Sequence, residues 1–134
     1  TMAKSWEKYG IHALETVYPI VGPGFESIQN IGDKNRNIVH LHHSKGIDIN
    51  IANIHDMLGG FGLISLMGTK GGIQIKSTDT YYAFKKQLQS YVNYLQTGHK
   101  PVPWNETYEL MQLVSAGIES REKGGIKITL NKDN

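Results

Sequence analysis

Hydrophobic residues follow a helical period near the start of the chain. At about 100° per residue, seven apolar positions fall on one broad arc. These positions are Trp6, Tyr9, Ala13, Leu14, Val17, Ile20 and Val21. Pro19 and the Gly22-Pro23-Gly24 cluster are typical of a helix end. The pattern predicts an amphipathic helix that ends in this region.

The middle of the chain changes to a period of two, which is typical of strands with one buried face. The clearest case is Ile47, Ile49 and Ile51 alternating with Asp48, Asn50 and Ala52. The expected strands are 25–33, 37–44, 47–55, 61–69 and a short one around Ile73 and Ile75. Glycine-containing turns at 45–46 and 70–72 are typical of hairpins. Strands in succession with short turns predict an antiparallel meander.

A helical period then returns. A second helix is predicted from five apolar residues on one face, with Thr97-Gly98 as its stop signal. They are Phe84, Leu88, Tyr91, Val92 and Leu95. The tyrosines of this region are expected to be core or interface aromatics. They are Tyr81, Tyr82, Tyr91, Tyr94 and Tyr108.

A third helix and a short strand close the chain. Asn105 is the expected N-cap and Glu106 lies in the first turn. The predicted buried stripe is Tyr108, Met111, Ser115 and Ile118, with Leu110, Val114 and Gly117 beside it. Residues 123–125 (Lys-Gly-Gly) are a C-terminal cap signal, and 126–130 are the last strand. The order predicts an α+β fold: one mostly antiparallel open sheet with helices packed on one face.

The composition narrows the partners and the chemistry. The chain has 134 residues, no cysteine, and 14 Lys plus Arg against 12 Asp plus Glu, for a formal net charge of +2. Without cysteine there are no disulfides, thiolate metal ligands or thiol nucleophiles. The small charge argues against nucleic acid or membrane as a partner, and no apolar run approaches the ~20 residues that span a bilayer. The length is that of one domain, and the Thr1-Met2 start favours a domain excised from a longer protein.

The first predicted helix carries a row of polar side chains opposite its apolar arc. Lys8, His12 and Glu15 lie at positions i, i+4 and i+7, so they share one face. A histidine titrates near neutrality and can exchange a proton with a hydroxyl or carbonyl. The carboxylate could orient the imidazole, and the lysine could bind an oxyanion. The alternative is the ordinary solvated face of an amphipathic helix.

A second group of histidines lies on the predicted strands. His40 and His42 share one strand face and His43 points to the other, with His55 and Asp56 further along. The spacing matches no closed zinc motif, so a polar sheet face is the simpler interpretation. A metal enzyme using His40, His42 and His55 stays open as an alternative.

The glycine-rich stretches do not form a nucleotide motif. Neither 22–24 nor 57–62 gives a strand, G-x-G-x-x-G and a helix in that order. The run 59–62 is expected to be a turn or bulge. No G-x-S-x-G sequence is present, which argues against a serine hydrolase of that kind.

Two segments resemble a known family. The segment KYGIHALETVYPIVGPG resembles the helix that opens the C-terminal domain of the glucose–fructose oxidoreductase, inositol dehydrogenase and MocA family, where a glycine, a histidine and an acid recur at the spacing of Gly10, His12 and Glu15. The tail FKKQLQSYVNYLQTGHKPVPWNETYELMQLVSAGIESREKGGIKITL resembles the closing segment of that domain. Together with the strands between them, the resemblance spans essentially the whole chain.

The resemblance implies a fold and a place in a larger enzyme. The fold would be that of a dihydrodipicolinate-reductase-like C-terminal domain. Residues 1–134 would form a single substrate-binding and oligomerisation domain, and an N-terminal Rossmann domain, absent from this chain, would bind NAD or NADP. The open sheet would pack on a second subunit in a homo-oligomer. The cytoplasm is expected rather than export.

The resemblance also implies residue roles. His12 would be the catalytic acid/base, with Lys8 and Glu15 as substrate-binding residues for a sugar or polyol. Two positions depart from the family pattern: Glu15 stands where aspartate is more usual, and Lys8 where the family often has aspartate. These departures indicate either a different substrate or loss of dehydrogenase chemistry.

The leading hypothesis is therefore that this chain is part of an NAD(P)-dependent oxidoreductase. The isolated chain is expected to be inactive and to bind no nicotinamide, because it lacks the Rossmann fingerprint. A non-catalytic binding or assembly module is the alternative. The histidine-ligated metal enzyme is the third hypothesis.

Overall fold

The structure is a computed structural model that describes residues 2–58, 62–76 and 79–130. Its helices are α1 (Trp6–Val21), α2 (Thr80–Thr97) and α3 (Trp104–Glu122). Its strands are β1 (Met2–Ala3), β2 (Phe25–Asn30), β3 (Arg36–His43), β4 (Ile47–Ile54), β5 (Leu63–Gly68), β6 (Gly71–Lys76) and β7 (Ile128–Thr129). Apart from the short β1, the order of helix, strands, two helices and strand is the predicted one. None of the described helices is both long and apolar enough to cross a membrane.

The main sheet has the strand order β1-β4-β3-β2-β7, and its neighbours are antiparallel except for the parallel pair β1 and β4. The predicted meander is correct for β2, β3 and β4. It is wrong for β5 and β6, which form a separate two-stranded sheet. The reason is that β1 takes the outer edge of β4, where Met2 is the register partner of Asn53.

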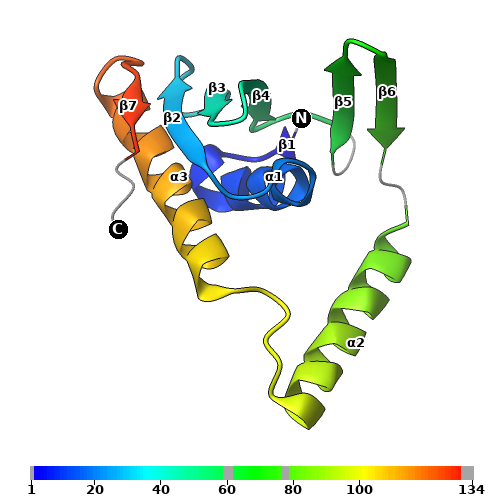
Figure 1. Cartoon of the computed structure of the whole chain (residues 1–134). Coiled ribbons are helices and arrows are strands. Elements are labelled where there is room, and N and C mark those ends of the chain that lie inside the picture. The colour runs from blue at the N-terminus through cyan, green and yellow to red at the C-terminus, as the bar shows by residue number, and fades with distance from the viewer. Residues whose placement is uncertain (1, 59–61, 77–78, 131–134) are drawn as a thin grey trace.

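Helices α1 and α3 cover one face of this sheet (Figure 1). The α+β fold with helices on one face is thereby confirmed. The core lies between these two helices and the inward residues of the three central strands. Its strand residues include Ile28, Val39, Leu41 and Ile51, none more than 4% exposed. The opposite face of the sheet carries no helix of the described chain (Figure 1).

Trp6 is the residue on which α1 and α3 meet. Its side chain is fully buried, and its Nε1–H donates to the carbonyl oxygen of Val114 at 3.0 Å. A Cβ atom added at Gly117 would lie 2.6 Å from Trp6 Nε1, and one added at Gly10 would lie 2.7 Å from Trp6 Cδ2. The indole therefore occupies space that only glycine leaves on each helix.

The buried face of α3 differs from the predicted stripe. Tyr108 is 60% exposed, Met111 is 52% exposed and Ser115 is exposed, so this part of the prediction is wrong. The residues that are buried instead are Leu110, Leu113, Val114, Ala116, Gly117 and Ser120. The two stripes are neighbours on the helix surface, and the close approach of Gly117 to Trp6 selects the second one.

Two helix-end predictions change as well. Pro19 lies inside α1, which continues to Val21. An exposed proline there deprives only the Glu15 carbonyl of a helical partner, and water can replace it. The N-cap of α3 is Pro103, with extended backbone, and not Asn105. The caps at Gly98 and Gly124, both at positive φ, are as expected.

Helix α2 is unlike the other two. It has the predicted helical form, but none of its residues is buried. In Figure 1 it extends away from the sheet and the other helices. Four of the predicted core or interface aromatics, Tyr81, Tyr82, Tyr91 and Tyr108, are more than half exposed. They are therefore not core residues of this chain, and their role in an interface stays a prediction.

We expect Gly117→Ala to destabilise the domain by up to about 2 kcal/mol. The new methyl group must displace the buried indole, which costs about 1–3 kcal/mol, and alanine regains roughly 1 kcal/mol over glycine in a helix interior. Urea unfolding measures the difference. Ser115→Ala, at an exposed position of the same helix, is the control and should be neutral or slightly stabilising. Equal stability of Gly117→Ala and Ser115→Ala would contradict a tight contact between Gly117 and the Trp6 indole.

Candidate functional site

The polar row on α1 lies on the side of the helix away from the sheet. His12 Nδ1 is 3.0 Å from Glu15 Oε2, and the side chains are 47% and 54% exposed. The Tyr9 ring meets the imidazole edge-on, with centroids 5.3 Å apart. The structure thus brings together two of the three residues that the spacing selected. Lys8 is exposed one turn before His12.

The hydrogen bond to Glu15 has a chemical consequence for the histidine. When Nδ1–H donates to the carboxylate, the Nε2 lone pair is the proton-accepting position of the neutral ring. Proton exchange with a hydroxyl at Nε2 is the chemistry that such a pair can offer.

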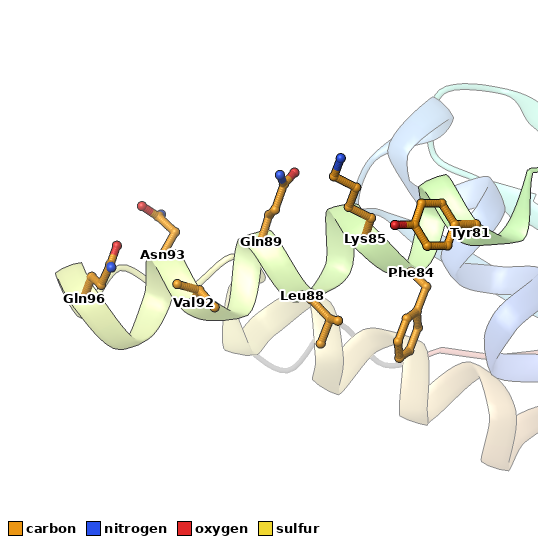
Figure 2. A pocket seen from close by; sticks show the side chains of 8 residues that line it. All are labelled: Tyr81, Phe84, Lys85, Leu88, Gln89, Val92, Asn93 and Gln96. Atoms are coloured by element: carbon orange, nitrogen blue, oxygen red, sulfur yellow. The ribbon is translucent and has the colours of Figure 1, made fainter.

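Two hollows of the described surface lie away from this row. One shallow hollow of about 420 Å³ runs along α2 (Figure 2). Its lining residues are Tyr81, Phe84, Lys85, Leu88, Gln89, Val92, Asn93 and Gln96. A second lies on the β5–β6 hairpin. Neither is lined by Lys8, His12 or Glu15, so a binding cleft at His12 would need walls from outside this domain.

The outer face of the sheet holds a second polar group. Asp48 Oδ1 lies 2.8 Å from His42 Nδ1 and 3.2 Å from His40 Nε2. The hydrogen bond from His42, followed by that from His40, holds the pKa of the Asp48 carboxyl below its usual value. His40 and His42 share one strand face, as the alternation predicted.

His43 lies on the inner face and is fully buried. Its Nε2 is 3.0 Å from the Pro23 carbonyl oxygen, and its Nδ1 accepts the Lys45 N–H at 3.1 Å. Both ring nitrogens therefore bind backbone, and the ring supports the loop after α1. Within residues 2–58, 62–76 and 79–130, no three His, Asp or Glu side chains are arranged to hold a metal ion. The geometry thus gives the metal-enzyme hypothesis no ligand set.

The loop 22–24 is tied down by a carboxylate that the sequence analysis missed. Glu109 Oε1 accepts the backbone N–H groups of Gly24 and Phe25 at 2.8 and 2.9 Å. Its Oε2 accepts the Tyr18 hydroxyl at 2.8 Å. The glutamate lies 85 residues beyond Gly24, so no local motif could have revealed the pairing.

The contacts of Glu109 leave no place in this loop for the phosphates of a dinucleotide. The backbone N–H groups that could bind an anion already donate to Glu109, and a phosphate would meet that carboxylate. The loop therefore does not fit a nicotinamide dinucleotide. The other glycine-rich run, 59–62, lies largely outside the described residues.

A second network missed from sequence joins the start of α1 to the end of α3. Arg121 forms an ion pair with Glu7 and donates to Asn37 Oδ1 at 3.0 Å. Burial would raise the pKa of Glu7, but the hydrogen bond and charge of Arg121 hold it below its usual value. Asn30 donates to the same Asn37 oxygen at 3.0 Å. The network fixes the end of α1 on which the polar row begins.

Comparison with known proteins supports the fold. No family model matches the chain, and no curated protein matches it in sequence. Solved structures of dehydrogenases share its fold. The myo-inositol dehydrogenase from Lactobacillus casei in complex with NAD(H) and myo-inositol is 15% identical, with a TM-score of 0.74 over 92% of this chain and 47% of that one. A myo-inositol dehydrogenase from Corynebacterium glutamicum is 20% identical, with a TM-score of 0.75 over 98% of this chain and 54% of that one.

The chain spans about half the length of these dehydrogenases. It has the fold of one part of them, consistent with a C-terminal domain as the resemblance implied. At such identities the likeness shows the fold alone. The roles of Lys8, His12 and Glu15 stay predictions.

The Tyr18–Glu109 contact makes stability depend on alkaline pH. Burial, followed by the hydrogen bond and charge of Glu109, raises the pKa of Tyr18 above its ordinary value of 10.0. The folded state therefore favours the protonated phenol. This contribution is complete below about pH 10 and is lost as the pH rises through the higher pKa of the folded protein.

As the pH rises from about 8 to about 11, we expect the free energy of unfolding to fall less for Tyr18→Phe than for the wild type. Urea unfolding midpoints measured across this range check the difference in slope. Tyr82→Phe, at an exposed tyrosine, should keep the wild-type slope. If all three proteins show the same slope, ionisation of Tyr18 is not linked to folding.

Proposed function

We propose that this chain is the substrate-binding and oligomerisation domain of an NAD(P)-dependent oxidoreductase that acts on a sugar or polyol derivative. The observation that carries the proposal is the His12–Glu15 hydrogen bond on the outward face of α1. The shared fold supports it, because the two dehydrogenases have this fold in about half of their length. One of them is described with NAD(H) and myo-inositol bound.

His12 is the proposed acid/base. Its Nε2 takes the proton of a substrate hydroxyl while Glu15 keeps the ring in the required tautomer and stabilises the resulting positive charge. Lys8, one turn earlier on the exposed side of α1, would bind a substrate oxygen. All three side chains reach outward, so a substrate held against this face must be enclosed by another part of the protein.

The enclosing part is proposed to be an N-terminal Rossmann domain of a longer protein. The nicotinamide would bind there, since the N–H groups of Gly24 and Phe25 in this chain already donate to Glu109. When bound, the dinucleotide supplies the hydride acceptor or donor. The residues of this chain would position the substrate and move its hydroxyl proton.

We expect His12→Ala, in a protein that carries both domains, to lower turnover by about 10²–10⁴-fold, the usual contribution of a general acid/base. Steady-state kinetics with myo-inositol and related polyols give the comparison. His99→Ala removes an exposed imidazole from the connector after α2 and should leave turnover unchanged. A rate unaffected by His12→Ala would favour the alternative of a binding or assembly module without chemistry.

The outer sheet face is proposed to bind a second subunit. His40, His42, Asp48 and Asn50 lie there with the apolar side chain of Ile38, which is 41% exposed. Asn50 is the register partner of His40, at the middle of this face. A mixed polar and apolar sheet surface of this kind is suited to an interface.

We expect Asn50→Lys to halve the mass of the particle measured by light scattering, because it places a desolvated charge in the contact. Asn35→Lys makes the same change at an exposed residue between β2 and β3, and it should leave the mass unchanged. The sheet contact would be excluded if Asn50→Lys had the wild-type mass at every concentration.

A further inference from the structure

Tyr9 joins the hydrophobic core to the polar row of α1. It lies three positions before His12, and Glu15 lies three positions after it, so the three side chains follow one another around the helix in steps of about 60°. Tyr9 is partly buried and packs against the core. The side chains of His12 and Glu15 are 47% and 54% exposed. His12 therefore lies between a ring anchored in the core and a carboxylate that reaches into solvent.

The two neighbours restrain different features of the imidazole. The ring centroids of Tyr9 and His12 are 5.3 Å apart and their planes are inclined by 71°, which is the edge-on arrangement that aromatic pairs prefer. Helical side chains point back toward the preceding turn, and Tyr9 occupies that turn. Glu15 Oε2 lies 3.0 Å from Nδ1. The carboxylate thus fixes one nitrogen, and the Tyr9 ring fixes the inclination of the imidazole plane.

The two restraints differ in strength. An exposed pair such as His12 and Glu15 competes with water, and a long carboxylate side chain loses rotational freedom when it is held. Tyr9 is already held by its packing on the core, so its ring adds a restraint at little further cost in entropy. The backbone below the imidazole is also restrained, because Thr16 Oγ1 donates to the His12 carbonyl oxygen at 2.7 Å.

We propose that Tyr9 is a positioning residue for His12. Its core-anchored ring holds the imidazole plane in the orientation in which Glu15 engages Nδ1 and Nε2 exchanges a proton with the substrate hydroxyl. This inference rests on the proposed function, since it gives Tyr9 a part in the same proton transfer. Tyr9 acts through the imidazole, so its ring matters to turnover only while His12 is present.

Nuclear magnetic resonance on the 134-residue chain tests the contact without any measurement of activity. Tyr9→Phe keeps the ring, whereas Tyr9→Leu and Tyr9→Met keep an apolar side chain against the core and remove the ring. Val17→Ala is the control, because Val17 also packs against the core from α1 but lies more than a turn beyond His12. His12→Ala identifies the imidazole resonances, and urea unfolding verifies that each variant is folded.

We expect nuclear Overhauser effects between the ring protons of His12 and of residue 9 in the wild type and in Tyr9→Phe. The His12 ring-proton resonances should keep their positions in Tyr9→Phe and Val17→Ala. They should move toward those of the exposed His99 in Tyr9→Leu and Tyr9→Met, because the neighbouring aromatic ring is gone. Resonances of His12 that are the same in all these chains would contradict the contact.

Kinetics in a protein that carries both domains test the consequence for the reaction. Loss of the ring should lower kcat by roughly 2–12-fold, the factor that corresponds to one aromatic pair. KM should change little, because the substrate contacts of α1 are assigned to other side chains. Tyr9→Phe should restore the wild-type kcat, and Val17→Ala should keep it.

A double-mutant cycle separates positioning from a general loss of structure. Tyr9→Leu should slow the wild type but cause no further loss when His12→Ala is already present, because the residue through which it acts is then absent. A purely structural effect of Tyr9 on the domain would lower turnover by the same factor in both backgrounds.

Two kinetic results would overturn the positioning role and leave the proposed function intact. They are a Tyr9→Leu protein with the wild-type kcat while His12→Ala is slow, and an equal loss from Tyr9→Leu with and without His12. A His12→Ala protein with the wild-type rate would reject the proposed function and this inference together, whatever the resonances of His12 show.

Discussion

The indole of Trp6 lies fully buried between Gly10 of α1 and Gly117 of α3, and it donates a hydrogen bond to the carbonyl of Val114. Any side chain at either glycine would overlap the ring, so the two helices have little freedom to slide or rotate while the indole stays in place. Because α1 is held in this way, its apolar arc meets the sheet and its polar row must face outward. The position of His12 is thus a consequence of core packing on the far side of the helix.

The candidate functional surfaces of the domain lie on different sides. The His12–Glu15 pair lies on the outward face of α1, whereas His40, His42 and Asp48 lie on the uncovered face of the sheet. Helix α2, none of whose residues is buried, extends away from both (Figure 1). The His12–Glu15 pair of α1 and the histidines of the sheet therefore share no residues.

Two long-range links hold this arrangement. Glu109 connects α3 to Tyr18 and to loop 22–24, and Arg121 connects α3 to Glu7 and Asn37. Both links begin on α3 and end on or near α1, one at each end of that helix. Because Glu109 accepts the N–H groups of Gly24 and Phe25, the loop after α1 is fixed to α3 and these groups are not available to an anion. Helix α2 takes no part in either link, and none of its residues is buried.

The sequence by itself determined the order of the elements, the caps at Gly98 and Gly124, and the opposite directions of His42 and His43. These features depend on period, glycine conformation and strand alternation, which act over a few residues. It also selected the row that contains His12 and Glu15, although the role of that row stays a prediction. Only the tertiary structure decided which stripe of α3 is buried, that β1 replaces β5 beside β4, and that Glu109 closes loop 22–24. Each of these depends on contacts between residues far apart in the chain, because several local patterns satisfy the sequence equally and only long-range packing selects one of them.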